Sequence, residues 1–200
     1  MTDWSSIGRR SKRRGKTYER RCAKILMDFT STNFRSTPAS GGFNKQGGVV
    51  IREELFCGDL ICDNPDFRYC IEAKNREDFS FVALLKNPST ASFTKWWYQC
   101  VMDARLVKLK PLMFFKPNNR DDFVVMTLGE WDRYYAHEDC SYFEINCYNK
   151  PLTFTVEEKN SKGKKVKKEI TKKLPSVVMV DWKQFVRYHK PEQMFYNPVG

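Results

Sequence analysis

The chain has 200 residues, of which 41% are hydrophobic and 14% aromatic, and its formal net charge at pH 7 is +11. This size and composition predict one globular domain with a real core and exclude a disordered chain. No segment approaches the roughly 18 apolar residues of a membrane span, and the basic N-terminus lacks the apolar stretch of a secretory signal. The seven cysteines form no CxxC motif, so we expect reduced thiols in a cytoplasmic protein.

The positive charge is concentrated in two segments. Residues 1–24 contain nine Lys and Arg against two acids, and residues 159–173 contain eight Lys against one acid, so each segment carries +7. The rest of the chain is left at −3. Concentrated positive charge suits a polyanion, because each phosphate contact releases condensed counterions. A solubilising tail and a solvated hairpin are the alternative interpretation.

The N-terminal region is predicted to be a flexible arm followed by a helix. Residues 1–14 are polar and basic without periodicity, and a helix is predicted from Lys16, because apolar residues then recur on one face at helical spacing. That face consists of Tyr18, Cys22, Ile25, Leu26 and Phe29. Glu19 falls at its edge, beside Leu26. The following "FRSTPASGGF" predicts a short extended piece and a glycine-rich loop.

The middle of the chain predicts strands and a helix. Residues 55–63 and 68–74 are predicted as two strands joined by the turn "NPDF". The second alternates, so Glu72 and Lys74 share the face opposite its apolar residues. A helix is expected from about 92 to 108, with Trp96 in the core. Near-continuous apolar runs at 111–115 and 123–128 are typical of strands covered on both sides, and a short helix follows at 129–137. This order predicts an α/β fold with a mixed central β-sheet flanked by helices.

The C-terminal region has a different character. "LTFTVEEK" and "KKVKKEITKKL" flank the turn sequence "NSKG", which predicts a lysine-coated β-hairpin. Residues 176–180 are predicted as a strand, and Asp181 as the N-cap of a closing helix. We therefore divide the chain into a flexible basic arm (1–14), a core (15–137) and a C-terminal elaboration (138–200) whose basic hairpin packs on the core.

One group of charged residues predicts chemistry. A tight antiparallel pairing would bring Asp59 and Glu72 together at one end of the sheet, and carboxylates are ligands suited to Mg²⁺. Lys74, on the same face as Glu72, could hold the attacking water or neutralise charge on the phosphorane, and Glu19 could supply a third carboxylate. A bound metal that activates water and clamps the scissile phosphate is the standard means of phosphodiester hydrolysis. The alternative interpretation is an exposed ion pair on an edge strand, with Glu19 as a helix-surface charge.

These motifs resemble the PD-(D/E)XK nuclease superfamily, and within it the archaeal and phage Holliday junction resolvases. The matching residues are "GKTYERR" (15–21), "RSTPASGG" (35–42), "GDL" (58–60) and "IEAK" (71–74), within a resemblance that covers about residues 9–128. It implies a restriction-endonuclease-like core in which Glu19, Asp59 and Glu72 bind metal and Lys74 is catalytic. Ser40 would assist catalysis, and Gln99 is a possible accessory residue.

One departure from the family pattern concerns the literal Pro-Asp. This dipeptide is Pro65-Asp66, and we reject Asp66 as the ligand, because a turn residue so near Glu72 would project away from the sheet end. A zinc site at His137, Cys140 and Cys147 lacks convincing spacing.

The resemblance and the charge together predict a DNA enzyme. We expect a Mg²⁺-dependent endonuclease (Mn²⁺ as a substitute) that resolves Holliday junctions by paired nicks in DNA recombination and repair. It would act as a homodimer, because two opposed cuts need two sites related by a two-fold axis, and, with a phage as the expected source, in the host cytoplasm. The expected phosphate contacts are Arg9, Arg10, Lys12, Arg13, Arg14, Lys16, Arg35, Lys162, Lys164, Lys165, Lys167 and Lys168. The alternatives are another DNase, acting on linear duplex, flaps or DNA ends, and a non-catalytic DNA-binding accessory protein.

Overall fold

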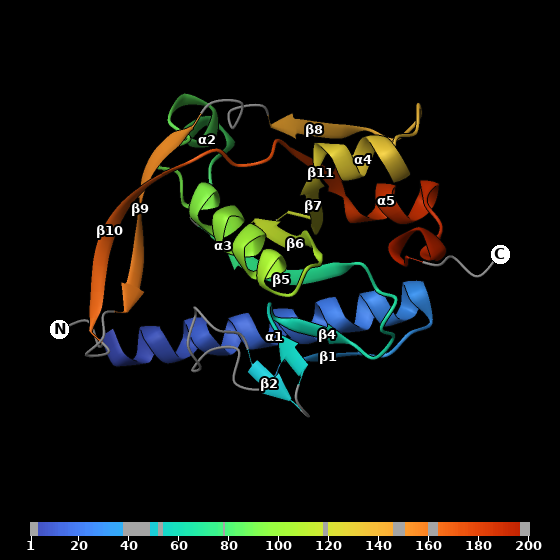
Figure 1. The fold of residues 1–200 in the computed structure, drawn as a ribbon, viewed down its shortest axis with the longest axis horizontal. Helices are drawn as coiled ribbons and strands as arrows, with labels where there is room; N and C mark the ends of the chain where they lie inside the picture. The colour runs from blue at the N-terminus through green and yellow to red at the C-terminus, as the bar shows by residue number, and fades with distance from the viewer. Residues whose placement is uncertain are drawn as a thin grey trace.

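A computed structural model describes residues 4–37, 49–51, 54–77, 79–117, 120–145, 151–159 and 164–196. Within these ranges the side chains of residues 4–12, 49–51, 54–56 and 157–159 and of Lys165 are not described. The helices are α1 (Trp4–Thr30), α2 (Phe81–Lys86), α3 (Ser92–Leu106), α4 (Leu128–Tyr134) and α5 (Trp182–Tyr188), followed by the 3-10 helix η1 (Pro191–Met194). The strands are β1 (Phe34–Ser36), β2 (Val49–Ile51), β3 (Glu54–Phe56), β4 (Leu60–Cys62), β5 (Tyr69–Arg76), β6 (Lys110–Pro117), β7 (Phe123–Thr127), β8 (Tyr142–Ile145), β9 (Leu152–Lys159), β10 (Lys165–Lys172) and β11 (Val177–Asp181). Figure 1 shows their arrangement.

The centre of the molecule is a seven-stranded mixed sheet in the order β1-β4-β5-β6-β7-β11-β8. Only β5 and β6 pair in parallel, and the other neighbours in this sheet are antiparallel. The strand pairs β2–β3 and β9–β10 form two further, separate ribbons. The predicted α/β fold with a mixed central sheet is confirmed.

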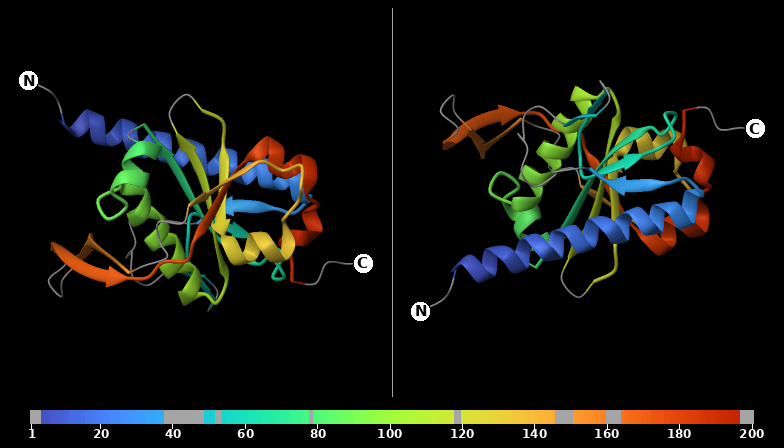
Figure 2. Two further views of the ribbon diagram at one scale, coloured as in Figure 1. Left: turned by 90° about the horizontal axis from the view of Figure 1, so that it is seen from above. Right: turned by 90° about the horizontal axis from the view of Figure 1, so that it is seen from below.

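Helices cover both faces of this sheet (Figure 2). One face packs against α1, α4 and α5, and it includes Ile71 of β5 and Phe114 of β6. The other face, with Met113 and Phe115, packs against α2, α3 and the β9–β10 hairpin. Burial on both sides explains the near-continuous apolar sequences of β6 and β7. No helix in the described ranges has the length and apolar content needed to cross a membrane.

The first helix is longer than the periodicity predicts. It begins at Trp4 rather than Lys16, so residues 4–14 continue α1, and the expectation of a flexible arm there is wrong. Arg and Lys are good helix formers, and a helix already stabilised by packing extends at little cost through such residues. The apolar face that begins at Tyr18 therefore marks where α1 meets the core, and not where the helix starts.

The predicted strand over 55–63 is divided in two. β3 ends at Phe56 and β4 begins at Leu60, and between them Gly58 has φ +83. This left-handed conformation interrupts the strand, and it is available to glycine at little cost.

The helix expected over 92–108 is confirmed as α3, but its buried face includes Trp97 in place of Trp96. Trp97 is fully buried and its indole N–H donates to the carbonyl of Pro175 at 3.2 Å. Trp96, expected in the core, is only half-buried and lies against Arg76, whose guanidinium carbon is 5.2 Å from the ring centroid. Adjacent residues of a helix point in different directions, so Trp96 and Trp97 cannot both face the core. Trp97 is the one that packs in the core.

The C-terminal region contributes directly to the sheet. β11 pairs with both β7 and β8, and Val177–Val180 are fully buried. The predicted hairpin is confirmed as the antiparallel pair β9–β10, and the side chain of Asp181 caps α5 by accepting from the N–H of Lys183 at 2.9 Å. Strands from both sides of residue 137 thus form one sheet.

Cysteines are dispersed through this core. The six in the described ranges (Cys22, Cys57, Cys62, Cys70, Cys100 and Cys140) form no disulfide, and all but Cys62 are buried. This agrees with thiols that pack as small apolar side chains.

Candidate active site

Asp59 is held in place by the backbone on either side of it. A Cβ on Gly58 would lie 2.5 Å from the carbonyl oxygen of Ile71, so only glycine allows the chain to pass this close to β5. The N–H of Asp59 donates to that same carbonyl at 2.7 Å. Its carboxylate accepts from the N–H of Ala73 at 2.9 Å. The carboxylate is therefore fixed against β5 beside Glu72.

The edge of β5 is open at this point in the described part of the chain. β4 pairs with β5 only through Leu60 and Ile71, so beyond Ile71 no described strand continues the ladder on that side. The carboxylate of Asp59 takes the place of a strand neighbour by accepting the Ala73 N–H. Within the described residues, an unpaired stretch of β5 therefore lies next to an acidic side chain.

Glu72 and Lys74 form a buried ion pair on the α3 face of β5. The carboxylate of Glu72 contacts the ammonium of Lys74, and the two side chains are only 3% and 14% exposed. The alternative of a solvent-exposed edge pair is therefore wrong. Removing one partner of a buried pair leaves an uncompensated charge and costs about 3–5 kcal/mol. The strand thus holds a carboxylate and an amine ready in a site that is largely shielded from water.

Helix α3 packs beside this pair. Cys100 lies on the buried face of α3, and burial raises the pKa of its thiol well above the ordinary value. Gln99 precedes Cys100 and is half-buried. Its accessory role remains a prediction.

Glu19 belongs to the helix that covers the opposite face of the sheet. It lies on α1, half-buried, next to Tyr18, which packs with Ile71 and Ala73 on the face opposite Glu72. Among the described residues, no three His, Cys, Asp or Glu side chains are grouped closely enough to hold a metal as they stand. The structure therefore brings Asp59 and the Glu72–Lys74 pair together, and it does not add Glu19 as a third ligand in direct contact.

The structure describes some of the other residues considered from the sequence, but not Ser40 or Cys147. Ser40 lies outside the described residues. Thr37, the last described residue before it, donates its N–H to the carbonyl of Asp59 at 2.9 Å. Asp66 is exposed in the turn before β5, at the end of the strand away from Lys74. Of the considered zinc trio, His137 is exposed, Cys140 is buried, and Cys147 lies outside the described residues.

The basic residues fall into two projecting elements. The N-terminal half of α1 and the β9–β10 hairpin extend at the same end of the molecule from opposite faces of the sheet (Figures 1 and 2). The α1 residues are Arg9, Arg10, Lys12, Arg13, Arg14 and Lys16, of which Arg13 and Lys16 have exposed side chains and Arg14 pairs with Glu77. The hairpin residues are Lys164, Lys165, Lys167 and Lys168, while Lys162 lies outside the described residues. Arg35 belongs to neither element and pairs with Asp63 at 3.1 Å.

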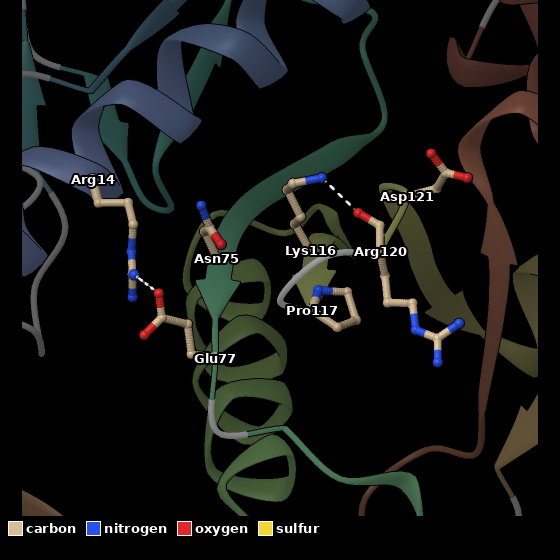
Figure 3. Close-up of a pocket in the computed structure, with 7 residues that line it drawn as sticks. All are labelled: Arg14, Asn75, Glu77, Lys116, Pro117, Arg120 and Asp121. Atoms are coloured by element: carbon tan, nitrogen blue, oxygen red, sulfur yellow. Dashed lines mark hydrogen bonds and ion pairs between the residues drawn. The ribbon is translucent and has the colours of Figure 1, made fainter.

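A polar pocket of about 520 Å³ lies at the C-terminal ends of β5 and β6 (Figure 3). Its lining residues are Arg14, Asn75, Glu77, Lys116, Pro117, Arg120 and Asp121. Of these, only Arg14 was expected from the sequence to have a function. Asn75 and Lys116 are register partners on parallel strands, and only the strand pairing reveals that they meet.

Comparison with known proteins identifies related sequences. The family model described as phage putative PDDEXK endonuclease matches residues 10–194. Protein D14 of Escherichia phage T5 is 28% identical over 109 residues, which are 53% of this chain and 64% of that protein, so the match spans less than two thirds of the relative. No solved structure matches.

Proposed function

The chain belongs to the family of phage PDDEXK endonucleases, and on this premise we propose that it is a metal-dependent endonuclease that resolves four-way DNA junctions by paired nicks. The family assignment supports the general part of this proposal, which is that the protein is a nuclease of the PD-(D/E)XK superfamily and acts on DNA. The preference for branched DNA, the paired cuts and a role in recombination and repair in the host cytoplasm are the proposal.

The observation that carries the proposal is the convergence of Asp59, Glu72 and Lys74 at one point of β5. Asp59 is fixed through the Ala73 N–H, and the residues on either side of Ala73 are the buried Glu72–Lys74 pair. Active sites are where burial and close charge partners concentrate in this way. Two fixed carboxylates and an amine are groups that can support metal-assisted phosphodiester hydrolysis.

The donor set suits Mg²⁺, or Mn²⁺ in its place. Asp59 and Glu72 supply hard oxygen ligands, and Mg²⁺ commonly keeps several waters beside one or two carboxylates. Glu19 would help to hold the same ion, either directly or through one of these waters. A divalent ion here would lower the pKa of a bound water and neutralise the scissile phosphate.

Among the protein side chains, Lys74 would contribute most to the hydrolytic step. Its ammonium, released from Glu72 when that carboxylate binds metal, would hold the attacking water or stabilise the charge that develops on the phosphate oxygens. Ser40 and Gln99 would assist from the adjoining loop and from α3. The small exposure of the pair restricts competing water and strengthens each of these electrostatic contacts.

The basic elements would hold the arms of the junction. The N-terminal half of α1 and the β9–β10 hairpin carry exposed cations that suit phosphate contacts without reading bases. A homodimer would present two sites related by a two-fold axis, as two symmetric cuts require. Light scattering on the purified protein tests this stoichiometry directly.

The decisive experiment uses a labelled synthetic four-way junction, with and without Mg²⁺. We expect paired nicks that need the metal and disappear in Asp59→Asn and in Lys74→Ala. Asp66→Asn is the matched control, because it changes the literal Pro-Asp in an exposed turn and should cut normally. Undiminished cleavage by both site variants would refute the proposed mechanism.

The substrate is resolved by comparing junction, flap and linear duplex at equal salt. Preferential cutting of the junction supports the proposal, whereas preferential cutting of flap or duplex assigns the same chemistry to another DNA structure. Tight junction binding without cleavage in Mg²⁺ or Mn²⁺ would identify a DNA-binding accessory protein instead.

A further inference from the structure

Groups suited to bind an anion line the pocket at the ends of β5 and β6. Arg14 comes from α1, Asn75 from β5, Lys116 from β6 and Arg120 from the residues that follow β6. Figure 3 shows the amide of Asn75 and the amine of Lys116 between the guanidinium groups of Arg14 and Arg120. Four segments of the chain thus place donor groups around one space.

The acids of this pocket already have cationic partners. Glu77 pairs with Arg14, and Asp121 pairs with Lys183 at 3.1 Å. The ammonium of Lys116 instead donates to the backbone carbonyl of Arg120 at 2.6 Å, which is a neutral acceptor. In the described part of the chain neither Lys116 nor Arg120 has a carboxylate partner. Two uncompensated positive charges therefore remain at the pocket.

The pocket adjoins the proposed site. Asn75 follows Lys74 directly, and the register partners of these two residues are Lys116 and Phe115 of β6. Successive residues of a strand point to opposite faces, so the pocket opens on the α1 side, one residue beyond the ion pair. Arg14 also belongs to the basic half of α1, so the pocket connects that element with the catalytic strand.

We propose that this pocket is a phosphate subsite that holds a backbone phosphate of the DNA strand next to the scissile one. The inference rests on the proposed DNA substrate and adds Asn75, Lys116 and Arg120 to its contacts. A guanidinium and an ammonium recognise phosphate through charge-assisted hydrogen bonds, and the amide adds a neutral donor. The subsite would position the strand, whereas Asp59, Glu72 and Lys74 would carry out the chemistry.

The test measures DNA binding by the protein with Lys74 intact, in EDTA, where metal-dependent cleavage should not interfere. The dissociation constant for a labelled duplex is followed by fluorescence anisotropy over a series of salt concentrations. Replacing both cations (Lys116→Gln with Arg120→Gln) should weaken binding about tenfold. It should reduce the slope of log K against log salt by about 0.9, the value for one lost phosphate contact. Asn75→Ala should weaken binding with no change in slope.

Two controls separate this effect from general charge and from misfolding. Arg105→Gln removes an exposed cation from the last turn of α3, near the start of β6 and far from its pocket end, and should leave the slope unchanged. Lys116→Arg keeps the charge and should retain most of the affinity that Lys116→Gln with Arg120→Gln loses. Thermal melting identifies any variant that has lost its fold. An unchanged slope in the folded double variant would overturn the subsite.

The source of the phosphate is distinguished by competition. We expect inorganic phosphate to compete only weakly, and oligonucleotides with and without a 5′-phosphate to bind equally. Strong binding of inorganic phosphate, or a requirement for the 5′-phosphate, would refute a backbone subsite.

Failure of the subsite is distinguishable from failure of the proposed function. If junction cleavage needs Lys74 while the pocket variants bind normally, the nuclease assignment stands alone. If the double pocket variant shows the reduced slope of log K against log salt while Lys74→Ala still cuts, the subsite is supported and the proposed mechanism fails. In the active protein the loss should appear in KM more than in kcat, as expected for a residue that positions substrate.

Discussion

The strands β5 and β10 are both eight residues long and both carry lysines, but they use them differently. β5 lies within the seven-stranded sheet, and its Lys74 is 14% exposed and paired with Glu72. Among the described strands, β10 pairs with β9 alone, and its Lys167 and Lys168 are exposed to solvent. The first environment fixes one amine at one point, whereas the second presents several charges over a surface.

This difference indicates two kinds of contribution. A lysine held at one position should matter through its location, so no neighbouring lysine can replace it. Exposed lysines should matter through their number, because each adds one counterion-releasing contact. Substitutions in the two strands should therefore change different measured quantities.

The largest difference is expected between the cleavage rates of Lys74→Ala and Lys167→Ala. The first should reduce the single-turnover cleavage rate about a thousandfold, within the range for loss of an acid–base group, and the second less than about twofold. Rapid-quench cleavage of saturating substrate measures both. Equal losses would mean that Lys74 acts only as one more cation.

The backbone that supports β5 gives the next largest effect. Gly58→Ala should lower the free energy of unfolding by about 2–4 kcal/mol, because the new Cβ would meet a backbone carbonyl and the residue has positive φ. Gly129→Ala is the matched control, because nothing lies within 4 Å of its Cβ and it sits in α4, where alanine should be neutral or stabilising. Urea unfolding measures the difference. A mild effect at Gly58 would show that the Asp59 turn is adaptable.

Loss of the hairpin lysines should weaken DNA binding in proportion to the number of lysines removed. Changing Lys164, Lys167 and Lys168 together to Gln should reduce the salt slope of DNA binding by about 2.7 if each contacts one phosphate. The melting temperature should stay nearly constant, because these side chains are exposed. Anisotropy titrations at several salt concentrations test this. A single lysine that accounts for the whole change would contradict the idea of additive charges.

The smallest expected effect is the change in the free energy of unfolding with pH that comes from Cys57 and Cys62. Burial raises the pKa of Cys57 and of Cys62 to about 11. A raised folded-state pKa stabilises the protein fully below the unfolded value, near pH 9, and this stability is lost as the pH rises towards 11. After allowance for solvent screening we expect a loss of about 1 kcal/mol per thiol. Urea unfolding between pH 8 and 10 measures it as the difference between the unchanged protein and Cys57→Ala or Cys62→Ala, because the other buried thiols and the tyrosines also ionise in the unfolded state over this range. Cys62→Ala should flatten the profile.

The alternation of β5 was a reliable guide because it reflects a local property, the period of a strand. Glu72 and Lys74 do share one face, and Asp59 does lie beside them. The same reasoning could not place Glu19, because sequence periodicity gives a residue's angle on its helix and not the face of the sheet that the helix covers.

Other features depended on long-range pairing. The pocket exists because the ends of β5 and β6 lie side by side, although about forty residues of chain separate them. The start of α1 was missed because its basic residues have no apolar periodicity, although they are good helix formers. The contribution of β8 and β11 to the central sheet likewise follows from pairing across the whole chain.

The cysteines have a practical consequence. Burial raises the pKa of every described thiol, so little thiolate is present at neutral pH and reaction with maleimides should be slow. A single cysteine introduced on the hairpin, for example by Lys167→Cys, would react far faster than these. A fluorophore attached there, with its acceptor on a DNA arm, could then report energy transfer as the hairpin approaches its substrate.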